Sequence, residues 1–162
     1  MNTLFIFGAK YLFLISLIVI AVIFYQAKPE ERWQMLKYGA IILPLTYLLG
    51  LLARELYYDP RPFVLGGFNP LIDHLPDNGF PSDHTLLTSS LAMITYFFHK
   101  KSSFWLWIMA VAVGASRVYV GVHHSIDILG SIVLALVSGY LAHVIISKLW
   151  NKHTNHIDTL FR

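Results

Sequence analysis

The sequence contains no cysteine and few charged residues. Without cysteine, disulfide frameworks, thiolate metal sites and cysteine nucleophiles are all excluded. Charged residues make up 13% of the 162 residues and hydrophobic residues 56%, a balance too apolar for a soluble domain of this size. Composition alone therefore predicts an integral membrane protein, with membrane lipids around it.

The sequence also lacks a long basic run and any basic segment rich in aromatic residues. The net charge is +3, but a nucleic-acid-binding protein gathers such charge on one stripe or patch. We therefore expect no nucleic-acid partner. No clear cluster of residues with metal-ligand spacing stands out either.

Five stretches approach the roughly 20 apolar residues that a membrane-spanning helix needs. They run from Leu4 to Ala27, Tyr38 to Tyr58, Ser82 to His99, Ser103 to Gly121 and Ser125 to Trp150. The first resembles a signal peptide because Lys10 precedes an apolar core, but no small-residue cleavage site follows, and we interpret it as a retained span. These stretches predict an all-α fold: a polytopic bundle of about five transmembrane helices forming a single domain over residues 1–162.

One connection, residues 59–81, is much longer than the others. Its prolines and glycines disfavour a continuous helix, and a loop of this length in a compact protein is usually functional or disordered. The segment is too apolar for simple disorder. We expect it to fold back onto the membrane interface. His74 in this segment could contact a substrate headgroup or simply face water, and we favour water.

The basic residues divide unequally between the two sides that five spans define. One side receives Lys28, Arg32, Lys37, Lys100, Lys101, Lys148, Lys152 and Arg162, and the other receives Lys10, Arg54, Arg61 and Arg117. The positive-inside rule makes the first side cytoplasmic. We therefore expect the long loop to face outward from the cell membrane and the C-terminus to be cytoplasmic. Three arginines kept outside against this bias require a functional reason.

Three short polar segments gather on this side, "RELYYDPRP", "FPSDH" and "SRVYVGVHHSID", and the first and third contain the arginines. Taken singly, each charged residue has an ordinary explanation: Arg54 as an interfacial arginine paired with Glu55 or Asp59, and Asp127 as a carboxylate at a helix N-terminus. Together the segments gather forked cations, which match phosphate oxygens, and imidazoles, which transfer protons near neutral pH. The combination favours a site for a phosphorylated, anionic substrate.

The three segments resemble the signature motifs of the type 2 phosphatidic acid phosphatase superfamily, which are K-x6-R-P, P-S-G-H and S-R-x5-H-x3-D. The spacing within each motif and the order of the motifs are kept. The resemblance implies that His123 attacks phosphorus to form a phosphohistidine while Asp127 orients it. His84 would protonate the leaving oxygen and then activate water.

The phosphate-binding residues implied by the resemblance are Arg54, Arg61, Arg117 and Ser82, and the implied mechanism needs no metal or cofactor. Two positions depart from the family pattern. Arg54 replaces a lysine and keeps the positive charge. Asp83 replaces a glycine and places a carboxylate beside an anion site, where it could cap the helix dipole or pair with Arg54 or Arg61.

The motifs are also similar to those of undecaprenyl-diphosphate phosphatases of the bacitracin-resistance type, which implies undecaprenyl diphosphate as substrate. Phosphatidylglycerophosphate, phosphatidic acid and lipid A remain alternatives. A catalytically silent lipid-binding or lipid-flipping protein is the non-enzyme alternative. The sequence leaves the oligomeric state open.

Two further expectations concern the last span. His123 and Asp127 are four residues apart and share a helix face if the span begins near residue 123, whereas His124 points elsewhere. We therefore expect His124→Ala to keep much of the activity. Small residues at intervals of four below Asp127 predict close packing of this span, on the span before it.

Overall fold

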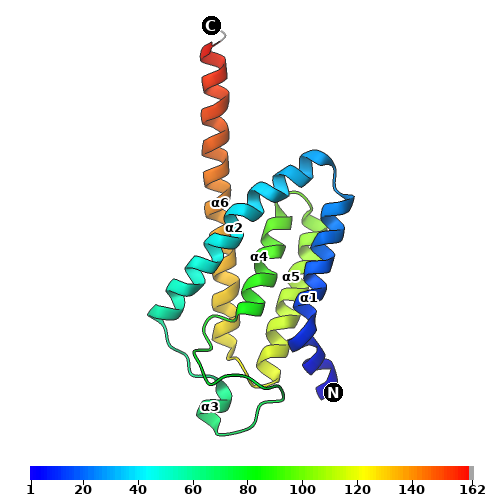
Figure 1. Ribbon diagram of the computed structural model, residues 1–162, viewed down its shortest axis with the longest axis vertical. Coiled ribbons are helices and arrows are strands. Elements are labelled where there is room, and N and C mark those ends of the chain that lie inside the picture. The colour runs from blue at the N-terminus through cyan, green and yellow to red at the C-terminus, as the bar shows by residue number, and fades with distance from the viewer. Residues whose placement is uncertain (161–162) are drawn as a thin grey trace.

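The computed structural model is all-helical within the part of the chain that it describes, which is the backbone of residues 1–160 and the side chains of residues 1–149. The helices are α1 (Asn2–Gln26), α2 (Pro29–Leu56), α3 (Pro62–Gly66), α4 (Asp83–Tyr96), α5 (Lys100–Tyr119) and α6 (Ser125–Leu160). Five of them run along one bundle, and the short α3 lies beyond its end (Figure 1). The predicted all-α membrane bundle is confirmed.

The helix lengths differ from the five predicted spans. Among the residues that the structure describes, three helices are long and apolar enough to cross a membrane: Asn2–Gln26, Pro29–Leu56 and Ser125–Leu149. The central helix α4 has 14 residues, which gives a rise of about 21 Å at 1.5 Å per residue, short of the roughly 30 Å hydrocarbon core. Helix α2 begins nine residues before the predicted span. Spans for α4 and α5 therefore stay predictions.

The centre of the bundle is α4, although its sequence is rich in hydroxyl groups. Its buried polar residues are Thr85, Thr88, Ser89, Ser90 and Thr95. Several of these hydroxyls donate to carbonyls one turn earlier in α4, as Ser90 does to Leu86 at 2.8 Å. Because these side chains are small and most of their hydroxyls have partners in or beside the helix, α4 can be surrounded by α1, α2, α5 and α6.

Helix α6 packs mostly on α4 and α2 and makes only a smaller contact with α5, the preceding span on which the sequence predicted it to pack. A Cβ added at Gly139 would lie 2.2 Å from Met93 Cγ of α4. Nearer the N-terminus of α6, the Ser131 hydroxyl donates to the Ser82 carbonyl at 2.9 Å and to the Asp127 carbonyl at 2.8 Å. The small face of α6 thus fixes the start of α4 beside Asp127.

The segment between α2 and α4 folds across one end of the bundle (Figure 1). Asn78 anchors it by donating to the carbonyls of Arg54 and Tyr57 at 3.0 Å, and its side-chain oxygen accepts the Asp59 N–H. The Leu71 N–H donates to the Val120 carbonyl at 3.0 Å. These contacts hold the loop against the turn that joins α5 to α6, which contains both adjacent histidines.

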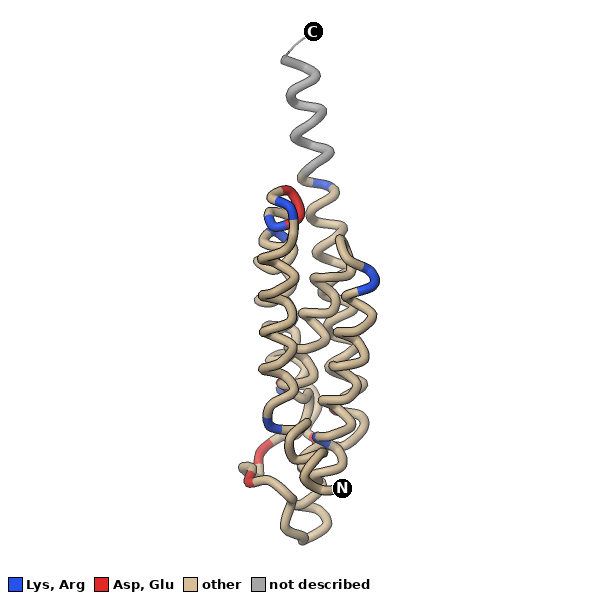
Figure 2. Tube along the Cα trace, turned by 90° about the vertical axis from the view of Figure 1, so that its right-hand side faces the viewer, with Lys and Arg blue, Asp and Glu red and all other residues tan. Residues whose placement is uncertain are grey.

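Charged residues gather near the two ends of the bundle. Figure 2 shows basic and acidic residues together at the end away from the loop, and another group at the loop end. The loop end contains Arg54, Arg61 and Arg117, as the sequence predicted for one side of the membrane. Which end faces the cytoplasm stays a prediction.

The α5–α6 contact yields a prediction on stability. A Cβ at Gly114 would lie 2.4 Å from Ile128 Cγ2 of α6, whereas one at Gly39 of α2 would meet only Ile94 Cδ1 at 3.8 Å. Gly114→Ala should destabilise the protein by about 1–3 kcal/mol through overpacking, measured as a lower unfolding temperature in detergent. Gly39→Ala is the matched control and should be neutral or stabilising, because alanine favours helix. Equal effects of the two substitutions would contradict this packing.

Candidate active site

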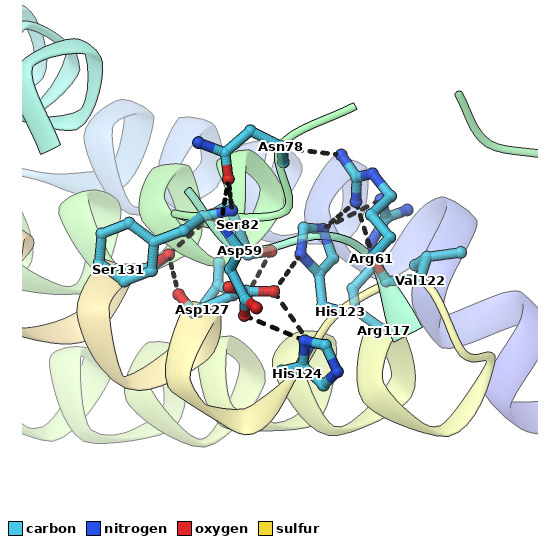
Figure 3. Close-up of polar contacts among 12 residues, drawn as sticks. Asp59, Arg61, Asn78, Ser82, Arg117, Val122, His123, His124, Asp127 and Ser131 are labelled. Atoms are coloured by element: carbon cyan, nitrogen blue, oxygen red, sulfur yellow. Dashed lines mark hydrogen bonds and ion pairs between the residues drawn. The ribbon is translucent and has the colours of Figure 1, made fainter. Parts of the chain in front are cut away.

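Two buried arginines converge on one histidine at the loop end of the bundle. Arg61 is 5% exposed and follows Pro60 at the start of α3; its Nη1 lies 3.3 Å from His123 Nε2. Arg117, in the last turn of α5, is 4% exposed, and its Nη2 lies 3.4 Å from the same nitrogen. Figure 3 shows the side chains around this point. Segments 56 residues apart in the sequence thus form one cationic pocket.

Backbone carbonyls help to hold the two guanidinium groups. Arg61 Nη1 donates to the Val122 carbonyl at 2.8 Å. Arg117 Nη1 donates to the Ala9 carbonyl of α1 at 3.4 Å. Because buried cations need compensating acceptors, these carbonyls orient the guanidinium groups toward the histidine.

His123 is held from its other ring nitrogen by Asp127. The distance between His123 Nδ1 and Asp127 Oδ2 is 3.0 Å, and the Asp127 side chain is fully buried. A proton on Nδ1, donated to the carboxylate, leaves the Nε2 lone pair facing the arginines. Burial, with the charges of Arg117 and Arg61, lowers the pKa of His123. The imidazole is therefore neutral and able to act as a nucleophile.

The geometry of this pair differs from the sequence expectation in one respect. Helix α6 begins at Ser125, so His123 lies in the preceding turn and not on the helix. Its contact with Asp127 is made across the helix N-terminus. The His124 N–H donates to the same carboxylate oxygen at 2.9 Å.

His84 lies in the first turn of α4, close enough to Arg117 and His123 for their charges to interact. The Phe13 ring of α1 packs edge-on against it, with 4.5 Å between ring centroids. His84 is thus a second imidazole beside the nucleophile candidate. It belongs to a different helix and has different partners.

The other predicted phosphate-binding residues, Ser82, Arg54 and Asp83, have no contact with His123 among the hydrogen bonds and ion pairs of the described residues. Ser82 is fully buried, and its hydroxyl accepts from Thr85 at 3.2 Å. Arg54 pairs with Asp83 at 2.9 Å, with side chains 35% and 70% exposed, so this pair lies at the rim. Such exposed pairs contribute at most about 1 kcal/mol. The expected pairing of Asp83 with Arg54 is thus present, whereas the pair's contact with phosphate stays a prediction.

Two loop residues near the nucleophile were not singled out as site residues from the sequence. Asp77 Oδ1 accepts from Arg61 Nε at 2.6 Å. Burial alone would raise the pKa of Asp77, but Arg61 lowers it below the ordinary value. The His74 ring lies 6.2 Å from the His123 ring, and its side chain is 23% exposed. The expectation that His74 simply faces water is therefore wrong, since only the fold of the loop brings it here.

Asp59, His124 and Asp127 also meet beside the nucleophile. Their carboxylate and imidazole atoms lie within 4.8 Å of one another, and these atom types can bind a metal ion. His124 Nδ1 lies 3.0 Å from Asp59 Oδ2, and Asp127 accepts from two histidines. We interpret the three residues as a hydrogen-bonded network within the protein.

A cavity of about 430 Å³ adjoins His123, lined by Phe68 and Leu71 of the loop and by the α5–α6 turn. An apolar groove of about 480 Å³ between α1, α5 and α6 shares Val118 and Tyr119 with it. The site therefore combines a cationic pocket, a neutral imidazole and an adjacent apolar surface. This arrangement suits attack on the phosphorus of an anionic group attached to an apolar chain.

Comparison with known proteins agrees with this chemistry. The family model described as PAP2 superfamily matches residues 34–151. The bacitracin transport permease protein BcrC of Bacillus licheniformis is 36% identical over 72% of this chain and 58% of its own length. The undecaprenyl-diphosphatase BcrC of Bacillus subtilis is 30% identical over 87% of this chain and 72% of its own length.

Two solved structures have a similar fold. The crystal structure of the first transmembrane PAP2 type phosphatidylglycerolphosphate phosphatase from Bacillus subtilis matches with a TM-score of 0.59 and 27% identity, covering 90% of this chain and 74% of that one. Aquifex aeolicus LpxE matches with a TM-score of 0.66 and 20% identity, over 86% and 81% of the two chains, which shows the fold alone. By its family match and its relatives, the chain belongs to the PAP2 superfamily.

Proposed function

We propose that this protein is a membrane lipid phosphatase that hydrolyses undecaprenyl diphosphate to undecaprenyl phosphate through a phosphohistidine. The observation that carries the proposal is the convergence of Arg61 and Arg117 on Nε2 of a buried His123 whose Nδ1 faces Asp127. A protein that only binds or flips lipid would need the arginines, but not an oriented neutral imidazole between them. This geometry therefore favours catalysis over binding alone.

In the first step, His123 Nε2 attacks the terminal phosphorus, and the bond from that phosphorus to the bridging oxygen breaks. Arg61 and Arg117 bind the non-bridging oxygens and stabilise the charge that they carry in the transition state. Asp127 stabilises the imidazolium that forms as Nε2 gives up its lone pair. His84 donates a proton to the leaving oxygen, which departs with undecaprenyl phosphate.

In the second step, His84 accepts a proton from water, and the water oxygen attacks the phosphohistidine. The bond between phosphorus and Nε2 breaks, inorganic phosphate forms, and His123 recovers its neutral state. The two histidines thus have opposite roles because they have different partners. No step requires a metal ion.

Undecaprenyl diphosphate is favoured as substrate by the relative of that name, the undecaprenyl-diphosphatase BcrC. The apolar groove that adjoins the His123 cavity provides a surface for an isoprenoid chain. Phosphatidylglycerophosphate is the second candidate, because phosphatidylglycerophosphatase B of Bacillus subtilis is 33% identical over 80% of this chain. Phosphatidic acid and lipid A use the same phosphate chemistry, and a side-by-side assay of the four lipids distinguishes them.

The site faces the extracytoplasmic side in this proposal, and the C-terminus is cytoplasmic. The positive-inside rule supports this orientation, because most Lys and Arg residues of the sequence fall on the other side.

The orientation can be tested by cysteine labelling, since the chain has no native cysteine. Asn69→Cys, in the loop, should react with a membrane-impermeant maleimide in intact cells. Lys101→Cys, at the opposite end of the bundle, should react only after the membrane is permeabilised. The reverse pattern would overturn the proposed topology.

The mechanism can be tested by phosphate release from undecaprenyl diphosphate by the purified protein in EDTA. His123→Ala should reduce release to background because it removes the nucleophile. His84→Ala should reduce it by about 10²–10⁴-fold, the usual contribution of a general acid–base group. His99→Ala is the control, since His99 lies near Glu31 at the far end of the bundle, and it should match the wild type. Equal release by His123→Ala would exclude the phosphohistidine.

A further inference from the structure

The second of the adjacent histidines has more contacts than a bystander would. His124 Nδ1 lies 3.0 Å from Asp59 Oδ2, and the His124 N–H donates to Asp127 Oδ2 at 2.9 Å. Asp59 and His124 both fall at variable positions of the family motifs, so the residues that define the motifs do not include this contact. His124 therefore joins a carboxylate from the loop to the carboxylate that supports the nucleophile (Figure 3).

Asp59 and Asp127 create an electrostatic problem. Both carboxylates are poorly accessible to water, with side chains 13% and 0% exposed, and atoms of the two lie within 4.8 Å. Two carboxylates this close do not both ionise without a compensating charge, and otherwise they share a proton. Asp127 Oδ1 is buried and has no hydrogen-bond partner, so nothing else in its surroundings satisfies this oxygen. A shared proton would withdraw negative charge from His123.

We propose that His124 is a positioning residue that keeps Asp127 ionised, because it pairs with Asp59 and carries the proton that the two carboxylates would otherwise share. This inference rests on the proposed function, because it concerns the carboxylate behind the phosphohistidine nucleophile. His124 is 35% exposed and can exchange its proton with solvent, whereas Asp127 cannot. The ion pair between His124 and Asp59 neutralises the loop carboxylate. Asp127 then interacts with His123 alone.

The other charged groups at the site do not replace His124. Arg61 and Arg117 face His123 from the opposite side of its ring, and Asp77 already pairs with Arg61. The His74 ring is edge-on to that of His123, with 6.2 Å between ring centroids, and His84 lies in the first turn of α4. Burial, followed by the hydrogen bond and charge of Asp127, raises the pKa of Asp59, and His124 opposes this rise. Among the described residues, His124 is therefore the basic group in direct contact with the second carboxylate.

The test measures kcat for phosphate release against pH, in EDTA so that no metal cation replaces the His124 proton. In His124→Ala, the carboxylate pair takes up a proton at higher pH. The acid limb of the kcat profile should therefore shift to higher pH by about one unit, so that kcat at a given pH on that limb falls about tenfold. Asp59→Asn removes the competing carboxylate and should restore the limb in the double variant His124→Ala, Asp59→Asn. His99→Ala, the same substitution far from the site, should leave the profile unchanged.

A purely structural role for His124 predicts a different result. Such a role would lower kcat equally at all pH values, and Asp59→Asn would not restore it. Either of these two results would overturn the proposed role of the His124–Asp59 pair. Wild-type protein that releases no phosphate from any lipid phosphate would instead refute the proposed function.

The unfolding temperature measured against pH needs no substrate, so it tests the His124–Asp59 pair even if the proposed function is refuted. A carboxyl whose pKa is raised in the folded state stabilises the fold below its unfolded pKa of about 3.9 and loses this contribution as pH rises through the folded pKa. The unfolding temperature of His124→Ala should therefore fall more steeply with rising pH than that of the double variant. Parallel curves would overturn the inference.

Discussion

The structure depends on burying two guanidinium groups against one neutral imidazole. Removing arginine from water is costly unless acceptors replace the water. Here the acceptors come from separate parts of the chain: Ala9 of α1 for Arg117, and Val122 and Asp77 for Arg61. His123 Nε2 is a further acceptor that the two cations share. His123, the proposed nucleophile, is thus also a structural acceptor, and in the proposed function the substrate phosphate would replace it as the partner of the two arginines.

The central position of α4 in the bundle helps to hold the site residues in place. A helix rich in buried hydroxyl groups is unusual in a core, but its small side chains let α4 lie centrally, and its own carbonyls accept from Thr88, Ser90 and Thr95. The Ser131 hydroxyl then joins the start of α4 to the first turn of α6. Consequently His84 and Asp127, on different helices, are fixed relative to one another.

Carboxylates partner three of the cationic or basic groups around the site: Asp77 with Arg61, Asp83 with Arg54, and Asp59 with His124. The site is therefore close to charge balance without substrate. In the proposed function, substrate oxygens would replace protein carboxylates as partners of the cations at the edge of the site, and the carboxylates would limit the electrostatic cost of the empty site. The Asp83 carboxylate, a departure from the family motif, fits this pattern.

Sequence by itself determined the membrane class, the helical fold and the core of the site, because apolar length and short motif spacings are local properties of the chain. The spacing between Arg117, His123 and Asp127 is short enough that the α5–α6 turn alone brings them together. Tertiary structure decided the rest. The packing of α6 on α4, the edge-on position of His74 against the His123 ring and the contact of Asp59 with His124 join residues from separate segments. No local pattern specifies such contacts, because they arise only when the loop folds across the end of the bundle.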